Sequence, residues 1–321
     1  LVMKQFDKKK ITLNSKLGEM LPEFKNSNKD SINFKDLMTH NARLQAWIPF
    51  YKATLDSCNK FQPSTKYYRK FKTDSFAIPV AKNLFLRNDY KDTIFAKIVA
   101  SKLLEKKQYK YSDLTFIILK EYLEHALKKP LQELTQKEFF LSMGMYKTMY
   151  NPYEKIPIEN IPPTEYDNYF RHELIQGYVH DMEAAMEGGV AGHAGLFSNT
   201  IDVAKMMQLY LQKGYYGGIQ YFSPETFDVF NTCYFCKDGN RRGLGFDKPL
   251  LGKEGPTCGC VPMSSFGHTG FTGGIAWADP ENELVYIFLS NRTFPDSNAA
   301  NKLSRENIRE DIQKVIQNAV V

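Results

Sequence analysis

The 321-residue sequence has no long hydrophobic run: no stretch approaches the roughly 20 apolar residues that a bilayer-spanning helix requires. It also has no internal repeat and no low-complexity tract, so it gives no sign of a solenoid or a fibrous protein. No signal peptide is present, but the chain opens with Leu1 instead of an initiator Met, so that absence does not locate the parent protein. The length suits one large domain or two modest ones with a substantial core.

Acidic and basic residues nearly balance, with 42 Lys and Arg against 36 Asp and Glu, for a net charge of +6. The basic excess is concentrated early, around residues 8–10 and 60–72, where the alternatives are an anionic partner and a solvated face. The sequence contains no nucleic-acid-binding motif and its acidic residues are interspersed throughout, so we expect no nucleic-acid partner.

Five cysteines are present, and four of them are clustered in pairs. A C-x2-C motif is followed by a C-x-C motif, in Cys233, Cys236, Cys258 and Cys260. The spacing leaves three alternatives open: a structural zinc site, disulfides in an oxidising compartment, or four ordinary small apolar side chains.

A glycine-rich segment near the C-terminus predicts an edge strand that holds a substrate. Residues 266–274 read FGHTGFTGG, where the glycines would let a backbone approach a ligand closely. The chain then turns at residues 279–282 and returns as residues 284–289, an apolar run typical of a buried central strand. Taken alone, the pattern is equally compatible with an ordinary glycine-rich hairpin.

Apolar spacing and capping residues predict helices in six other segments. They cover residues 31–40, 113–129, 131–143, 202–211, 224–230 and 305–320. The last one carries a stripe suited to covering one sheet face, formed by Ile308, Ile312, Val315 and Ile316. Residues 42–92 show no clear periodicity and are interpreted as a long irregular excursion, a kind of segment that is often functional.

Tyr111 and Asp113 stand on a predicted turn just before the helix at 113–129. The phenol could act as a general base if nearby cations lowered its pKa, and the alternative is a surface tyrosine beside a helix-capping aspartate. His180, Asp181 and His193 could ligate a metal ion, but neither histidine has a partner four residues away. We interpret these three as structural loop residues.

Five short motifs occur in a meaningful order along the whole chain, at residues 36–44, 111–113, 188–198, 268–270 and 289–292. Together they resemble the serine β-lactamase-like family, which includes class C β-lactamases, penicillin-binding-protein-like esterases and D-amino-peptidases. The pattern looks most like the module found C-terminal to glycoside hydrolase family 3 N-acetylglucosaminidases.

The resemblance implies an α+β fold, with an antiparallel sheet flanked by helices and a mostly helical lobe. It implies one module over residues 1–321 that lacks its first elements, with a helical sub-lobe at 31–161 and a sheet sub-lobe formed by 1–30 and 162–321. The implied chemistry is acyl-enzyme hydrolysis of an amide or ester, in which the serine of an S-x-x-K motif attacks the carbonyl carbon. The site would lie in the cleft between the two lobes.

The same resemblance assigns roles to residues of this chain. Tyr111 would occupy the family's Tyr-x-Asn position and relay a proton, although Asp113 stands where asparagine is usual. His268 would replace the lysine of the Lys-Thr-Gly motif.

Three neighbours of that histidine would bind the substrate. Thr269 would bind its carboxylate or carbonyl group, beside Gly270. The backbone N–H of Phe271 would supply half of the oxyanion hole.

The only S-x-x-K in the sequence is Ser57–Lys60, which lies downstream of His40 and therefore in the wrong order. By the family's spacing, the nucleophile should lie roughly ten residues before Leu1. We therefore expect the chain to be a C-terminal piece that is inactive by itself.

The resemblance also implies partners and a location. We expect a peptidoglycan-derived substrate, an upstream glycosidase module in the same parent chain, no cofactor beyond the zinc considered above, and a periplasmic or secreted location. The alternative function is a non-catalytic module that binds peptidoglycan fragments or serves as a scaffold for a glycosidase.

Overall fold

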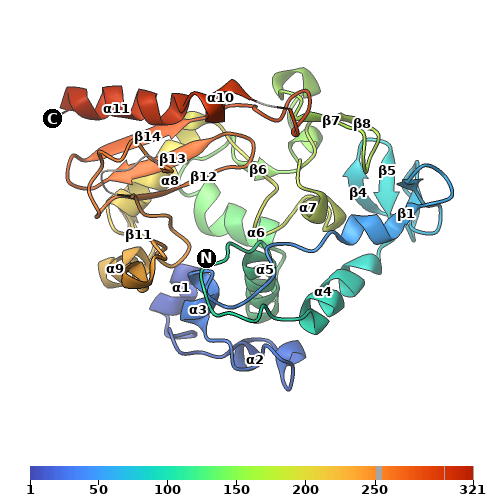
Figure 1. The fold of residues 1–321 in the computed structure, drawn as a ribbon, viewed down its shortest axis with the longest axis horizontal. Helices are drawn as coiled ribbons and strands as arrows, with labels where there is room; N and C mark the ends of the chain where they lie inside the picture. Colours follow the sequence, from blue (N-terminus) through green and yellow to red (C-terminus); the bar gives the residue numbers. More distant parts are fainter. Residues whose placement is uncertain (251–254, 300, 321) are drawn as a thin grey trace.

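In the computed structural model, which describes residues 1–250, 255–299 and 301–320, three antiparallel strands form the main sheet (Figure 1). They are β12 (Phe266–Thr269), β13 (Ile275–Asp279) and β14 (Leu284–Phe288), in the order β12-β13-β14. The glycine-rich segment therefore forms the predicted edge strand. The prediction that residues 284–289 form a central strand is wrong, because within the described residues β14 pairs with β13 alone.

Helices cover both faces of this sheet. The helix α8 (Thr200–Leu211) packs on β13 and β14 from one side. On the other side, α11 (Ile308–Val320) covers the face that carries Trp277 and Tyr286, and Ile316 packs against these two rings. Figure 1 shows the sheet between the two helices, which confirms the expected antiparallel sheet flanked by helices.

The sheet-facing side of α11 differs from the predicted apolar stripe. Val315 is 71% exposed and Ile312 is 36% exposed, whereas Gln313 and Gln317 are buried. These polar side chains are accommodated because they make hydrogen bonds: Gln317 Nε2 donates to Oδ2 of Asp279, the last residue of β13, at 2.6 Å. The side-chain oxygen of Gln313 accepts from a backbone N–H at 3.0 Å. Hydrogen bonds, rather than apolar spacing, thus determine which side of this helix faces inward.

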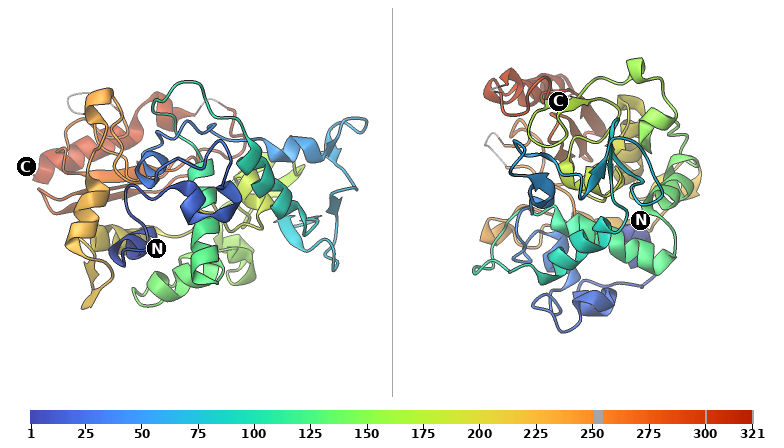
Figure 2. Two further views of the ribbon diagram at one scale, coloured as in Figure 1. Left: turned by 90° about the horizontal axis from the view of Figure 1, so that it is seen from below. Right: turned by 90° about the vertical axis from the view of Figure 1, so that its right-hand side faces the viewer.

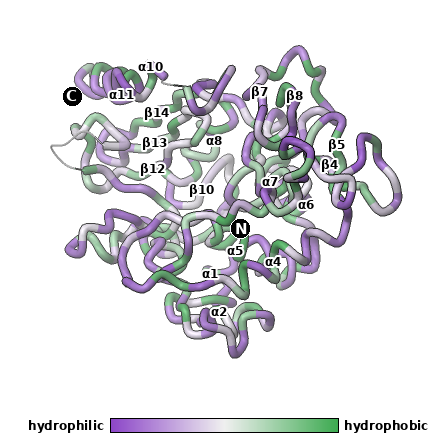
Figure 3. Tube along the Cα trace, turned by 45° about the vertical axis from the view of Figure 1, so that its right-hand side comes forward, coloured by the Kyte–Doolittle hydropathy of each residue, from purple (hydrophilic) through white to green (hydrophobic). Residues whose placement is uncertain are grey.

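The helical region is built around α5 (Leu114–Leu127), which lies in the middle of the molecule (Figures 1 and 2). Its apolar side chains are buried, and apolar residues, green in Figure 3, gather around it. It confirms the helix predicted from residue 113. Two neighbouring predictions are shorter in the structure: α3 covers Phe34–Met38, and α6 covers Leu131–Thr135 before a π-helical turn at Gln136–Phe140.

The predicted irregular excursion contains more structure than its sequence indicated. It forms a lobe that projects from the body, with a hairpin of β1 (Leu55–Asp56) and β2 (Gln62–Pro63) at one end (Figures 1 and 2). A second small sheet has the order β3-β5-β4, formed by Tyr68–Arg69, Leu84–Leu86 and Ile78–Ala81. The segment runs into α4 (Tyr90–Ala100), which the sequence analysis did not predict.

Short elements complete the described chain. The helices are α1 (Val2–Asp7), α2 (Leu17–Met20), α7 (Met182–Met186), α9 (Pro224–Asn231) and α10 (Lys302–Arg305). The 3-10 turns are at Pro22–Phe24, Phe50–Thr54, Pro152–Glu154, Ile158–Asn160 and Cys236–Asp238. The paired short strands are β6 (Met149–Tyr150) with β9 (Leu196–Phe197), β7 (Glu165–Asp167) with β8 (Glu173–Ile175), and β10 (Tyr215–Tyr216) with β11 (Ile219–Gln220).

None of the helices in the described part of the chain is both long and apolar enough to cross a membrane. The division into sub-lobes at 31–161 and at 1–30 with 162–321 stays a prediction.

Candidate active site

Tyr111 and His268 lie side by side although they are far apart in the sequence. Their ring centroids are 6.0 Å apart. Tyr111 precedes α5 on a turn that is tied to the chain around His40: Ser112 N donates to His40 Nδ1 at 3.2 Å, and Asp113 N donates to a backbone carbonyl at 2.9 Å. His268 comes from the edge strand β12. The structure thus brings together the phenol and the imidazole that the sequence analysis selected.

Arg242 is a third member of the site, and the sequence analysis missed it. Its Nη1 lies 2.7 Å from His268 Nε2, and its guanidinium carbon lies 5.4 Å from the centre of the Tyr111 ring. Its Nε donates to the Tyr109 hydroxyl at 3.3 Å. The only sequence signal was the adjacent pair Arg241-Arg242 between the two cysteine motifs.

The contacts of His268 fix its protonation state. Nε2 must accept the hydrogen bond from Arg242, because a guanidinium can only donate. Nδ1 lies 2.6 Å from the Thr269 carbonyl oxygen and must therefore donate to it. Burial, followed by the charge of Arg242, lowers the pKa of His268. The imidazole is therefore neutral at this site, and the cation beside Tyr111 is Arg242.

Tyr111 keeps its proton at neutral pH. Burial, reinforced by the negative charge of Asp113, raises the pKa of Tyr111 to about 12, and the Arg242 guanidinium offsets this only in part. The shift is opposite to the one that the general-base hypothesis required. In this arrangement the phenol is a proton donor, and it becomes a base only after it has given its proton away.

Asp113 stands at the start of α5, two residues after Tyr111. It occupies the helix N-cap position, but its side chain makes no capping hydrogen bond, so the alternative of a capping aspartate is not supported. Burial raises the pKa of its carboxyl to about 6, with the charge of His193 opposing the shift and the charge of Asp181 adding to it. Asp113 therefore changes its charge just below neutral pH.

His193 and Asp181 form an ion pair that influences Asp113 through their charges. His193 Nε2 lies 3.0 Å from Asp181 Oδ1, and this carboxylate also accepts from Ala184 N at 2.8 Å, which caps α7. Burial alone lowers the pKa of His193, but the hydrogen bond and charge of Asp181 outweigh it and raise this pKa to about 9. Within the described residues, no group of three or more His, Cys, Asp or Glu side chains is arranged to hold a metal ion.

Beyond Thr269 the edge strand enters a tight turn. Gly270 N donates to Gly274 O at 2.7 Å, and Gly273 has a positive φ of +107°, where a side chain would also collide with Ser290 Oγ. The Phe271 ring is 63% exposed, with the Arg292 guanidinium 4.4 Å from its centre. Glycine thus shapes the end of the strand, while the substrate-binding roles of Thr269, Gly270 and Phe271 stay predictions.

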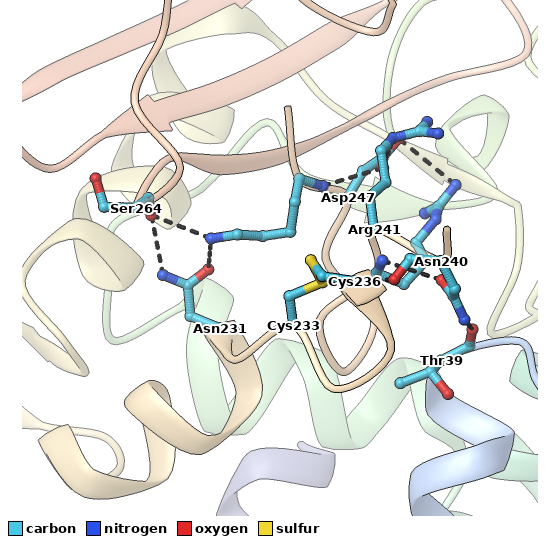
Figure 4. Close-up of a disulfide and its surroundings, with 10 residues drawn as sticks. Thr39, Asn231, Cys233, Cys236, Asn240, Arg241, Asp247 and Ser264 are labelled. Carbon is cyan, nitrogen blue, oxygen red and sulfur yellow. Dashed lines mark hydrogen bonds and ion pairs between the residues drawn. A yellow bond between two sulfur atoms is a disulfide. The ribbon is translucent and has the colours of Figure 1, made fainter. Parts of the chain in front are cut away.

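The clustered cysteines form two disulfides, Cys233–Cys236 and Cys258–Cys260, so the zinc and free-thiol alternatives are wrong for these four residues. Figure 4 shows the first of them. Each bridge joins cysteines within one motif. The first bridge closes a turn just after α9, ahead of the segment that carries Arg242.

Ser57 is exposed on the turn of the β1–β2 hairpin, on the projecting lobe (Figure 2). It is not on a helix that faces Tyr111, which agrees with its rejection as the nucleophile. A groove of about 1430 Å³ also lies elsewhere, because Lys91, Lys120 and Glu187 line it while Tyr111 and His268 do not.

Comparison with known proteins places the chain in a family. The model of the family described as Beta-lactamase matches residues 1–308. A candidate D-alanyl-D-alanine carboxypeptidase of Escherichia coli strain K12 is 34% identical over 216 residues, which cover 63% of this chain and 49% of that protein. A candidate of the same name from Salmonella enteritidis PT4 is 33% identical over 211 residues, 62% of this chain and 48% of that protein. The chain spans about half the length of the curated relatives it matches.

Solved structures agree on the fold. A penicillin-binding protein homologue from Pyrococcus abyssi has a TM-score of 0.58 at 16% identity, over 92% of this chain and 60% of that one. Simvastatin synthase from Aspergillus terreus has a TM-score of 0.63 at 12% identity, over 98% and 80% of the two chains. The chain belongs to the beta-lactamase family of penicillin-binding-protein-like serine hydrolases.

Proposed function

We propose that this chain forms the substrate-binding and proton-transfer part of an acyl hydrolase that cleaves an amide or ester bond near a carboxylate, as in a peptide that ends in D-alanyl-D-alanine. The observation that carries the proposal is the convergence of Tyr111, Arg242 and His268 at the end of the edge strand β12. The names of the curated relatives support the substrate class.

Charge balance favours an anionic group beside β12. Arg241 Nε lies 2.8 Å from Asp247 Oδ1, and Arg242 Nη2 lies 3.5 Å from Asp247 Oδ2, so two guanidinium groups share one carboxylate. Because His268 is neutral, an excess of positive charge remains. This excess attracts a substrate carboxylate, and the Thr269 hydroxyl next to it is a hydrogen-bond donor of the right kind.

Tyr111 supplies the proton that the leaving group needs. Its phenol is protonated at neutral pH, so it can donate to the leaving amine or alkoxide as the scissile bond breaks. The resulting phenolate is stabilised by the Arg242 guanidinium, which lies over the same ring. Tyr111 can then take a proton from the water that hydrolyses the acyl intermediate.

The nucleophile remains unassigned among the described residues. The exposed position of Ser57 on the projecting hairpin argues against it as the nucleophile, and the upstream S-x-x-K stays a prediction that the parent gene sequence tests directly. We expect the 321-residue chain alone to turn over neither nitrocefin nor a p-nitrophenyl ester. Turnover that survives Ser57→Ala but is lost in Tyr111→Phe would contradict this expectation.

The proposed substrate class is tested with N-acetyl-D-alanyl-D-alanine. We expect calorimetry to show that the chain binds this dipeptide more tightly than its C-terminal amide, because the amide lacks the charge that the arginines attract. Release of D-alanine by the protein as its gene encodes it should be lost in Tyr111→Phe and kept in Ser57→Ala. Equal binding of dipeptide and amide would contradict the carboxylate part of the proposal.

The alternative function, a non-catalytic module that binds peptidoglycan fragments, predicts the same binding without D-alanine release. We further propose a periplasmic or secreted location, which two disulfides support because such bonds persist in oxidising compartments. The upstream glycosidase module stays a prediction.

A further inference from the structure

A short covalent loop lies next to the segment that carries Arg242. The Cys233–Cys236 disulfide closes a turn directly after α9, and backbone hydrogen bonds of 3.1 Å join Gly239 N to Cys236 O and Asn240 N to Phe235 O (Figure 4). The turn is therefore held both by a covalent bond and by its own backbone. If the disulfide is cleaved, the two backbone hydrogen bonds still restrain the turn.

Asn240 links this turn to Arg242. The Cys233 sulfur lies 3.4 Å from the Asn240 carbonyl oxygen. The buried Asn240 side chain donates from Nδ2 to the Thr39 carbonyl oxygen at 2.9 Å and accepts from the backbone N–H of Arg242 at 3.1 Å. Through Asn240, the position of the disulfide turn thus influences the position of the Arg242 backbone.

The chain of contacts continues into the proposed site. Arg242 Nη2 lies 3.5 Å from Asp247 Oδ2, and Arg242 Nη1 lies 2.7 Å from His268 Nε2. Asp247 is itself bound to β12, since its backbone exchanges hydrogen bonds of 2.8 and 3.1 Å with Gly267. A displacement of the turn would therefore move the Arg242 guanidinium relative to the strand that presents His268.

We propose that the Cys233–Cys236 disulfide is a redox-sensitive clasp that positions Arg242 against His268, so that its cleavage by a dithiol loosens this contact and weakens binding of a substrate carboxylate. The part that concerns the substrate rests on the proposed function. Arg242 is here a positioning residue for His268 as well as a source of charge for the ligand.

The chemistry is a thiol–disulfide exchange. Cys236 is exposed and Cys233 is half-buried, so a thiolate of the dithiol attacks the Cys236 sulfur and Cys233 leaves as a thiolate that takes up a proton. The second thiol of the reductant then attacks the mixed disulfide and releases Cys236. The dithiol loses two electrons and becomes a disulfide, and the protein gains two thiols.

The second disulfide provides a matched control. The Cys258–Cys260 bridge closes an even shorter loop, and its Cys260 is also exposed. Its described contacts lead away from the site, because Cys258 N donates to Gln313 of α11 at 3.0 Å. Reduction of this bridge should leave Arg242 in place.

The first measurement needs no ligand. The His268 imidazole is followed by NMR during a pH titration of the oxidised chain, the dithiol-reduced chain, and the double variants Cys233→Ser/Cys236→Ser and Cys258→Ser/Cys260→Ser. We expect the pKa of His268 to rise on reduction and in the first double variant, and to stay unchanged in the second. Circular dichroism and thermal unfolding confirm that each form is folded.

The second measurement uses N-acetyl-D-alanyl-D-alanine and its C-terminal amide in calorimetry. We expect reduction to weaken dipeptide binding about fivefold, as a charged contact is partly lost, and to leave amide binding unchanged. The Cys233→Ser/Cys236→Ser variant should bind weakly with or without dithiol, whereas Cys258→Ser/Cys260→Ser should keep the wild-type response.

The outcomes separate the two ideas. An unchanged His268 titration after verified reduction of Cys233–Cys236 overturns the clasp, whatever the ligand does. If the titration shifts but neither dipeptide nor amide binds at any redox state, the clasp stands and the proposed substrate class is wrong. A response carried by Cys258–Cys260 instead also overturns the clasp.

Discussion

Two histidines, His268 and His193, show how the same side chain acquires different charge states within one fold. His268 meets Arg242, and burial together with that guanidinium lowers its pKa, so it is neutral. His193 meets Asp181, which overcomes burial and raises its pKa to about 9, so it is charged at neutral pH. Burial favours the neutral form at both positions, so the difference comes from the partner.

The comparison divides the site into two halves. On the β12 side, two arginines share Asp247 and leave positive charge that suits an anionic substrate group. On the α5 side, Asp113 lies in the field of the Asp181–His193 pair. Tyr111 is influenced by both halves: burial, followed by the charge of Asp113, raises its pKa, and the charge of Arg242 opposes this shift.

The largest effect should follow from Asp181→Asn, which removes the counter-charge of the acidic half. We expect a loss of about 3 kcal/mol in the free energy of unfolding at pH 7, because the change leaves a buried imidazole without its charged partner. Urea unfolding measures it. Asp89→Asn is the control, since its pair with Arg87 is exposed and screened by water and should contribute little to stability. Equal losses of unfolding free energy in the two variants would show that the Asp181–His193 pair is no more stabilising than the exposed pair.

The same pair predicts a dependence on alkaline pH. The pKa of His193 is raised from an ordinary 6.5 to about 9, so its stabilising contribution is complete below pH 6.5 and is lost as the pH rises through 9. The wild-type free energy of unfolding should therefore fall between pH 7 and pH 10 more steeply than that of His193→Gln. Parallel profiles would show that His193 does not carry the charge.

Arg242→Gln removes one of the two positive charges on the β12 side of the site. We expect binding of N-acetyl-D-alanyl-D-alanine to weaken about tenfold, because a charge-assisted contact is lost, while binding of the amide changes little. The pKa of His268 should rise in an NMR titration, since the guanidinium no longer opposes its protonation. Arg242→Lys should restore part of the affinity but not the geometry, because lysine lacks the planar fork of donors. Unchanged dipeptide affinity in Arg242→Gln would show that Arg242 does not bind the substrate carboxylate.

Asp113→Asn should stabilise the protein modestly at pH 8. The pKa of this carboxyl is raised from 3.8 to about 6, so its contribution to stability is present below pH 3.8 and is lost as the pH rises through 6. Because the residue is only half-buried, we expect a gain of about 1 kcal/mol at pH 8 and none at pH 3.5. Urea unfolding at the two pH values measures this difference, and destabilisation at pH 8 would contradict it.

Tyr109→Phe should have the smallest effect. The hydroxyl accepts one long hydrogen bond, 3.3 Å, from Arg242, and its loss should cost about 0.5 kcal/mol in stability. A dipeptide affinity reduced as much as in Arg242→Gln would show that Tyr109, rather than His268, fixes the arginine.

Local patterns predicted much of the helical core. The three- and four-residue spacing from Leu114 onward corresponds to α5, and polar capping residues located α8 and α9 within two residues of their starts. The helix α4 was missed although Tyr90, Ile94 and Ile98 repeat every four residues, because the polar segment before it hid the start of the pattern. The inward face of α11 could not be predicted, since Gln317 faces the sheet only because Asp279 is there to bind it.

The sequence by itself determined the family, the edge strand at β12 and the selection of Tyr111 and His268, because short motifs and periodicity are local properties of a chain. Only the tertiary structure decided that Arg242 joins them, that His268 is neutral while His193 is charged, and that the cysteines pair within their own motifs. Charges and hydrogen bonds act through a few ångströms of space, and it is the fold that sets those distances.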